Sequence, residues 1–206
     1  MRDVGGTGRR DVIVEAAARE FDRDGYATAS IAGIARAAGV SQGALHRTFP
    51  TKHAVALAVI DEQNARTFAA MSAGDPSPIG TLVRASRGIA DLLMRDVVVR
   101  AGIRISLEHG VLARQTASFY EQWIAGVVDE FRLAVARGEV TTDLSPEALG
   151  GTVVPYFTGV QLVSNVRSGR ADLLPVVATM WRVLVHAVVE RAHRERLLRV
   201  VDEVFA

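Results

Sequence analysis

A short polar and basic run, residues 41–47, carries the side chains that proteins use to read DNA. The amide of Gln42 pairs well with adenine N6 and N7 in the major groove, and the guanidinium of Arg47 suits phosphate. Gly43 and Ala44 are small, so the backbone there can approach a groove floor closely. We therefore expect base contacts from Ser41, Gln42 and Gly43, a close approach of Ala44 to the DNA, and phosphate contacts from His46, Arg47 and Lys52.

Two short helices joined by a glycine must position these residues. Ser30 stands where an N-cap belongs, and Gly39 ends the helix that follows it after about two turns. Ser41 caps the second helix, over 42–49, which Pro50 stops. Such a pair, resting on a longer first helix, is a helix-turn-helix. Ser30 therefore joins the expected DNA contacts.

The remaining sequence is also predicted to be helical, because apolar residues recur at three- and four-residue steps and strand signals are nearly absent. The predicted fold is all-α, with an N-terminal three-helix domain over residues 1–52 and a C-terminal helical domain over 53–206. We expect helices at 9–24, 31–38, 42–49, 52–71, 79–95, 97–109, 114–138, 146–168 and 172–204, the last broken near His193.

Composition narrows the classes of protein and of site. The chain has 206 residues, with 24 basic against 23 acidic side chains. It has no cysteine, so thiolate metal sites and disulfides are excluded. Residues 1–52 hold eight basic and six acidic side chains, net +2, and the sign of this charge favours a nucleic-acid role for the N-terminal part. No apolar run resembles a signal peptide, and the uncharged stretch 148–166 is too polar to span a membrane. We expect a cytoplasmic protein.

An enzyme is the main alternative from another class. The five histidines stand at positions 46, 53, 109, 186 and 193, without the H-E-x-x-H spacing of a zinc hydrolase. Glu108 and His109 form a pair by sequence only, and no phosphate loop or G-x-S-x-G elbow occurs. We therefore expect no catalytic residue, no metal and no cofactor. A helical adaptor that does not bind DNA is a second alternative.

The segment GYATASIAGIARAAGVSQGALHRTFPTKHAVALAVI, residues 25–60, resembles the DNA-binding region of TetR-family transcriptional repressors. The similarity covers roughly residues 9–60. The resemblance implies a homodimer, a palindromic operator in double-stranded DNA, and a C-terminal helical domain for ligand binding and dimerisation. Repression and activation both fit the sequence.

A second set of segments is similar to the γ-butyrolactone receptors of actinomycetes. They are VRAGIRI from Val99, FYEQW from Phe119, FTGVQ from Phe157 and the Met180-Trp181 pair. This resemblance implies a γ-butyrolactone-like effector; a repressor that answers to an unrelated apolar drug or antibiotic is the alternative. It also implies that Trp123 forms a wall of the ligand pocket, that Thr158 binds a lactone carbonyl, and that Gln63 reaches the ligand.

Each of these ligand residues also has a structural interpretation. Trp123 can be plain core, and Thr158 can bond the preceding turn of its own helix. Tyr120 and Gln161 complete the set of expected ligand contacts, although structural roles suit them better. For Arg47 and Lys52, discussed above, the structural alternative is a solvated surface charge.

The chain departs from these families at two expected DNA contacts. Most TetR relatives carry a tyrosine where this chain has His46, and the butyrolactone receptors usually carry a lysine where it has Gln42. Lysine favours guanine, so Gln42 predicts a different base at that operator position.

The dimer is expected to use an apolar stripe on the last two long helices. Its residues are Leu173, Val177, Met180, Trp181, Leu184, Val185 and Val188.

Overall fold

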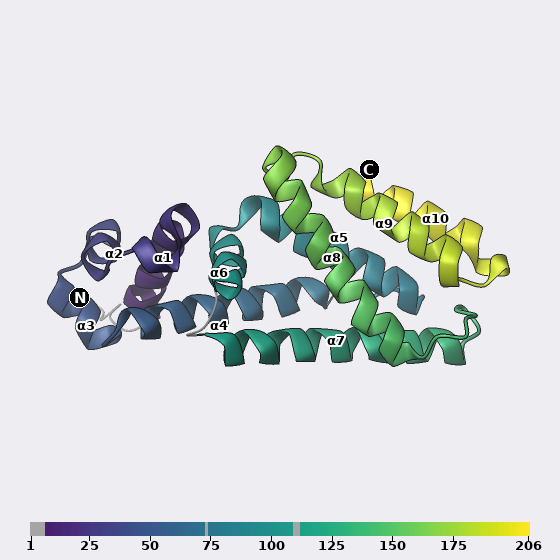
Figure 1. Ribbon diagram of the computed structural model, residues 1–206, viewed down its shortest axis with the longest axis horizontal. Coiled ribbons are helices and arrows are strands. Elements are labelled where there is room, and N and C mark those ends of the chain that lie inside the picture. The colour runs from purple at the N-terminus through teal and green to yellow at the C-terminus, as the bar shows by residue number, and fades with distance from the viewer. Residues whose placement is uncertain (1–6, 73, 109–111) are drawn as a thin grey trace, which may run out of the picture. The chain divides into compact units, whose positions relative to one another are not determined.

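The computed structural model describes residues 7–72, 74–108 and 112–206, which form ten α-helices and one isolated β-bridge, so the all-α prediction is confirmed (Figure 1). His109 and the first six residues of the predicted N-terminal domain lie outside the described residues. The helices are α1 (Thr7–Thr28), α2 (Ile31–Ala37), α3 (Gln42–Thr48), α4 (Lys52–Met71), α5 (Pro78–Arg95), α6 (Val97–Leu107), α7 (Ala113–Ala136), α8 (Pro146–Ser168), α9 (Leu173–Val188) and α10 (Arg191–Phe205).

Side-chain caps and glycines set the ends of the N-terminal helices. Ser30 Oγ accepts the Gly33 amide at 3.0 Å and begins α2, and Ser41 Oγ accepts the Ala44 amide at 3.1 Å and begins α3. Gly25 has φ 80° and ψ 166°, which kinks α1 at the predicted end of the first helix, although helical residues continue to Thr28. Both predicted caps and the predicted glycine turn are therefore confirmed.

The predicted helix over 172–204 is two helices, and its break lies earlier than expected. Val189 is extended, with φ −79° and ψ 135°, and forms an antiparallel bridge with Val140. The Glu190 amide donates to the Glu139 carbonyl at 2.9 Å. The predicted break in this helix is confirmed, but it lies at Val189 and Glu190, a few residues before His193, because pairing with a segment about fifty residues away fixes its position.

One compact unit comprises the residues up to Thr67 and those from Arg95 to Ser118. Its core joins α1, α2, α3, α4 and α6 through side chains that are at most 1% exposed, among them Phe21, Ile34, Leu45, Val59 and Ile105. Helices α1 and α6 lie side by side in it (Figure 1). The helix-turn-helix therefore shares its core with α6 and most of α4, which lie beyond the predicted domain boundary at residue 52.

Charged side chains link the helices of this first unit. Arg66 on α4 binds Glu15 on α1 at 2.8 Å and Asp96 at the start of α6 at 2.9 Å, and Glu62 on its own helix. Partial burial acts to lower the pKa of Arg66, but hydrogen bonds to these carboxylates outweigh it and raise that pKa above its usual range. One guanidinium thus ties three helices together.

The second compact unit comprises residues Phe68–Met94 and Phe119–Ala206. The carboxylate of Glu139, 5% exposed, lies among its helices and accepts the Ser77 hydroxyl at 2.5 Å and the Ile79 amide at 3.1 Å. Arg196 on α10 pairs with its second oxygen at 3.4 Å. This buried acid therefore joins the start of α5 to the end of α7 and to α10.

The apolar stripe that we expected at a dimer interface lies inside this second unit. Leu173, Val177, Met180, Trp181 and Val185 are at most 1% exposed, and Val188 is also buried; Leu184 is half-buried. The dimer stripe is therefore not available to a second chain in this structure, because α9 packs it into the core of its own unit. The exposed apolar side chains of α8 and α9 are different ones, including Val163, Val166 and Val183.

Candidate DNA-reading helix and ligand cavity

Helix α3 presents most of the expected DNA contacts on an exposed face. Gln42, Gly43 and Arg47 are exposed, Ala44 is half-buried, and the capping Ser41 is exposed at the start of the helix. Leu45 is the residue of α3 that is buried, and it is fully so. A seven-residue helix with one core anchor thus leaves its N-terminal turn open to a partner.

The turn before α3 has the geometry of a helix-turn-helix. Gly39 takes φ 66°, which only glycine adopts without strain, and the Val40 amide donates to the Ala35 carbonyl at 3.0 Å. Ser30, at the far end of α2, is exposed and uses its hydroxyl oxygen as the helix cap.

His46 has one of its two ring nitrogens occupied. Its Nδ1 lies 3.1 Å from the Pro50 carbonyl oxygen, which can only accept, so Nδ1 carries a proton in that contact. In a neutral imidazole Nε2 is then an acceptor, and it becomes a donor to phosphate only when the ring is doubly protonated.

Lys52 does not extend freely into solvent. Its Nζ donates to the carbonyl oxygens of Tyr26, Ala27 and Ala29 at 2.8, 3.1 and 3.0 Å, and lies 4.7 Å from the centre of the Tyr26 ring. An ammonium group has three hydrogens, so these carbonyls use all of its donors. The geometry favours a structural role for Lys52 over the phosphate contact that the sequence suggests.

A small apolar cavity lies in the second unit beside Trp123. Its free volume is about 20 Å³, room for about one water molecule. Trp123 is 7% exposed and packs at 5.8 to 6.1 Å from the rings of Phe157 and Tyr120. The lining residues are Met71, Leu82, Ala85, Ser86, Ile89, Trp123, Val127, Val153, Val154, Phe157 and Trp181.

Trp181 is a lining residue that sequence reasoning assigned elsewhere. It is 1% exposed, and its indole Nε1 has no hydrogen-bond acceptor among the described residues. Periodicity placed it in the dimer stripe, since an apolar helical face looks alike whether it meets a cavity, a core or a second chain. The signal that was available is the residue type, because a buried tryptophan usually finds a partner for its N–H.

Of the other expected ligand residues in the second unit, Thr158 and Tyr120 have local partners, and Gln161 has none in the described part of the chain. The Thr158 hydroxyl donates to the Val154 carbonyl at 2.9 Å, one turn back on α8, which is the structural interpretation given above. Burial raises the pKa of Tyr120, while a hydrogen bond with Thr158 acts in the opposite direction. Gln161 is 2% exposed, and its Oε1 has no donor among the described residues, but it does not line the cavity.

Gln63 belongs to the first unit, unlike the other expected ligand residues. It is 1% exposed, its Nε2 donates to Thr67 Oγ1 at 3.2 Å, and its side chain lies against Gly102 of α6, where an added Cβ would collide with it. Gln63 thus fills the contact between α4 and α6.

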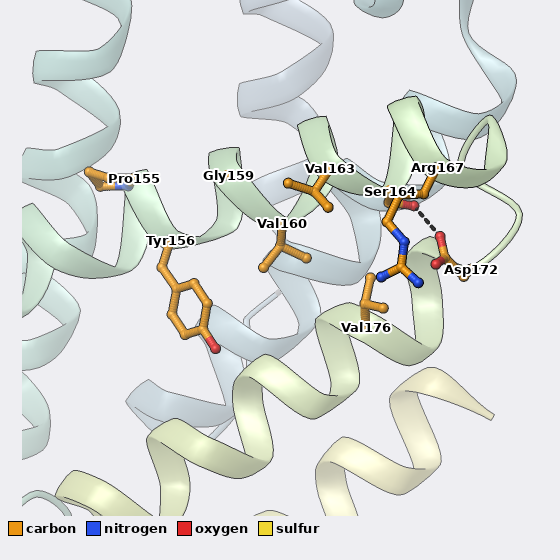
Figure 2. A pocket seen from close by; sticks show the side chains of 9 residues that line it. All are labelled: Pro155, Tyr156, Gly159, Val160, Val163, Ser164, Arg167, Asp172 and Val176. Carbon is orange, nitrogen blue, oxygen red and sulfur yellow. Dashed lines mark hydrogen bonds between the residues drawn. The ribbon is translucent and has the colours of Figure 1, made fainter.

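A larger apolar groove of about 470 Å³ runs along the outside of α8 and α9 in the second unit. Figure 2 shows Tyr156 and Val160 projecting from α8 toward α9, with Val176 on the facing helix. At one end the Ser164 hydroxyl donates to the Asp172 carboxylate at 2.6 Å. Hydrogen bonds from Ser164 and Ser168 lower the pKa of Asp172.

The part of the chain that the structure describes holds neither a candidate metal cluster nor a candidate membrane-spanning helix. No cluster of three or more histidine and acidic side chains there could hold a metal ion. None of its helices is both long enough and apolar enough to cross a bilayer.

Comparison with known proteins connects both regions to one family. Residues 13–59 match the family of bacterial regulatory proteins of the tetR type, and residues 76–190 match the tetracyclin repressor-like C-terminal domain. Over 176 residues the chain is 38% identical to the A-factor receptor protein of Streptomyces griseus; the match covers 85% of this chain and 62% of the receptor. The chain thus spans less than two thirds of the length of that relative.

Two solved structures are similar over nearly their whole length. Full-length TylP, a tetR regulator from Streptomyces fradiae, is 32% identical with a TM-score of 0.76 and covers 98% of this chain and 100% of its own. A gamma-butyrolactone receptor (ArpA-like protein) is 26% identical with a TM-score of 0.80 and covers 96% of each chain. With a family match over more than half of its residues, the chain belongs to the tetR family of bacterial regulatory proteins.

Proposed function

We propose that the protein is a transcriptional repressor that binds a palindromic DNA operator as a homodimer and is released from it by a γ-butyrolactone-like signal. The similarity to the A-factor receptor protein and to a gamma-butyrolactone receptor supports this effector class. A regulator of this kind works in the cytoplasm, where bacterial DNA lies, and is not an enzyme.

The observation that carries the proposal is the exposed first turn of α3. Gln42, Gly43 and Arg47 stand on the solvent side of a helix whose inner side holds the buried Leu45. In the helix-turn-helix mode, the N-terminal turn of the second helix enters the major groove and reads base edges. Ser41, Gln42, Gly43 and Ala44 then meet bases, Arg47 meets phosphate, and Ser30 and His46 flank them.

The homodimer is proposed to form on the outer face of α8 and α9. Val163, which lines the groove shown in Figure 2, is 55% exposed, and Val166 on the same helix is 85% exposed. A contiguous apolar face of this kind marks an interaction surface, and a second copy of the chain covers it.

The effector is proposed to enter the cavity beside Trp123. That cavity is apolar, and one of its lining residues, Trp181, has a buried indole N–H without an acceptor among the described residues, which a lactone carbonyl would satisfy. Because its free volume is only about 20 Å³, a lactone must displace the aromatic walls to fit. The effector then favours a state of the protein other than this one, and by linkage it weakens operator binding as strongly as operator weakens effector binding.

Fluorescence anisotropy tests the proposal, with the purified protein on DNA from upstream of its own gene at two salt concentrations, with and without synthetic γ-butyrolactones. We expect tight, salt-sensitive binding that the lactones release. If no lactone reduces DNA binding, the proposed effector class is wrong, and the proposed role as a repressor stands. If neither this DNA nor a random-sequence pool yields a specific site, the proposal fails.

A further inference from the structure

The segment Gly25–Ser30, which comprises the end of α1 from its kink onward and the link to α2, is held from two sides by charged side chains. We call this segment the α1–α2 joint. One side is Lys52, the first residue of α4, and the other is the last turn of α6 with Glu108. All of these residues belong to the first compact unit.

Lys52 binds the joint through its backbone oxygens. The three carbonyls of Tyr26, Ala27 and Ala29 converge on Nζ at 2.8 to 3.1 Å, and the Tyr26 ring lies beside the same charge at 4.7 Å. These carbonyls follow the Gly25 kink, in the last residues of α1 and the residue after it, and their converging oxygens stabilise a cation. Nothing remains on Nζ to donate to a phosphate oxygen.

Glu108 binds the joint through a backbone amide. Its Oε2 accepts the Tyr26 N–H at 2.8 Å, and its Oε1 lies so near Gly25 that a Cβ at that position would collide with it. On the same face of α6, Arg104 donates to the Asp22 and Arg23 carbonyls at 2.5 and 3.2 Å. The left-handed glycine therefore lets a carboxylate reach a backbone amide that a side chain would shield.

We infer that Lys52 and Glu108 are positioning residues for operator binding, which set the place of α2 and α3 by holding the α1–α2 joint and do not themselves contact DNA. The inference rests on the proposed function. It assigns to Lys52 a role different from the phosphate contact that its place in the motif suggests, and it gives Glu108, far away in sequence, a role in DNA reading.

The salt dependence of binding separates a positioning lysine from one that binds phosphate. Each phosphate contact contributes about −0.9 to the slope of log Kobs against log salt concentration. Removal of a positioning residue lowers Kobs by a similar factor at every salt concentration and leaves that slope unchanged. Arg47, which we propose as a phosphate contact, provides the matched control.

The experiment measures anisotropy between about 50 and 200 mM salt on a duplex that the wild-type protein selects from a random-sequence pool. The variants are Lys52→Met, Lys52→Arg and Arg47→Gln, each checked by thermal unfolding to be folded at the assay temperature. We expect Lys52→Met, which removes the charge, to weaken binding at least about tenfold with the wild-type slope. Lys52→Arg should do the same, because its planar guanidinium cannot meet three converging carbonyls. Arg47→Gln should reduce the slope by about 0.9.

Glu108 is tested by the sign of the effect. Because DNA is negatively charged, removal of a carboxylate that has no positioning role strengthens DNA binding or leaves it unchanged. We expect this result for Asp61→Ala, since Asp61 is exposed. Glu108→Ala should instead weaken binding, and Glu108→Gln, whose carbonyl still accepts the Tyr26 amide, should restore most of it. A reduced slope for Lys52→Met, full binding by Lys52→Arg, or tighter binding by Glu108→Ala overturns the inference alone. Absence of a selected site for the wild-type protein overturns the proposed function, and the inference with it.

Discussion

The two compact units treat their functional polar groups differently. At the α1–α2 joint, Lys52 Nζ directs all three hydrogens at carbonyl oxygens and Glu108 accepts a backbone amide. Beside the cavity of the second unit, the Trp181 indole N–H is buried without an acceptor among the described residues. The first arrangement is satisfied as it stands, whereas the second lacks a partner.

This difference fits the two tasks that we propose. A fully paired polar network favours one geometry over its neighbours, which suits a helix that must match the spacing of DNA. A buried donor without an acceptor costs about 1–3 kcal/mol, and a ligand that accepts from it recovers part of that cost. On the proposed function, the first unit then stays in one arrangement to read DNA, and the second unit is completed by an effector.

The largest expected effect comes from removing the anchor of α3. Leu45→Ala removes the buried side chain that holds this seven-residue helix, so we expect a loss of about 2–5 kcal/mol in the free energy of unfolding and loss of operator binding. Urea unfolding followed by circular dichroism measures it. Val12→Ala, at a 48% exposed position of α1, is the control and should stay within about 0.5 kcal/mol of wild type. A loss below about 1 kcal/mol in Leu45→Ala would show that other contacts hold α3.

A smaller effect is expected in the cavity. Trp181→Phe removes the unpaired N–H but also leaves a cavity in place of the second indole ring, so stability should fall by about 1–3 kcal/mol while affinity for a synthetic γ-butyrolactone falls about tenfold. Isothermal titration calorimetry measures the affinity. Thr158→Val is the matched control, because its hydroxyl already donates to the Val154 carbonyl and should contribute less to the effector. If Thr158→Val costs more affinity than Trp181→Phe, the indole is not the donor.

The sequence predicts best what local contacts determine. Ser30 and Ser41 were found as caps because each accepts an amide only three residues away. Gly25 and Gly39 were found as turns because positive φ values select glycine. The order of α2, turn and α3 follows from these residues together with the period of the apolar positions.

The hydrogen-bond partners of Lys52 and the surroundings of Trp181 could not be predicted from local contacts. The carbonyls that bind Lys52 lie 23 to 26 residues earlier in the chain, and Glu108 lies 82 residues from Tyr26. No periodicity encodes such distances. Nor does an apolar stripe tell whether Trp181 meets a cavity of its own chain or a second chain, since burial is non-directional.

The base preference of α3 gives a further test of the reading unit. Gln42 is exposed on the first turn, so Gln42→Lys should move the preferred base at one operator position from adenine toward guanine, by about tenfold in relative affinity. Selection from a random-sequence pool with both proteins measures the preference. An unchanged preference means that Gln42 does not contact that base.

The smallest effect is expected at the polar end of the groove on α8 and α9. Hydrogen bonds from the Ser164 and Ser168 hydroxyls lower the pKa of Asp172 below its ordinary 3.8, so the folded protein stabilises the carboxylate form. This contribution of Asp172 to stability is fully present above the pKa that Asp172 has in the unfolded chain. It is lost as the pH falls through the lower pKa that Asp172 has in the folded protein. Asp172→Asn should therefore be less stable than wild type at pH 7, and the two urea midpoints should converge progressively below about pH 4. Asp61→Asn, at an exposed position of α4, is the control for a general loss of negative charge. A constant difference between wild type and Asp172→Asn down to the lowest pH would show that the carboxylate form of Asp172 does not stabilise the turn between α8 and α9.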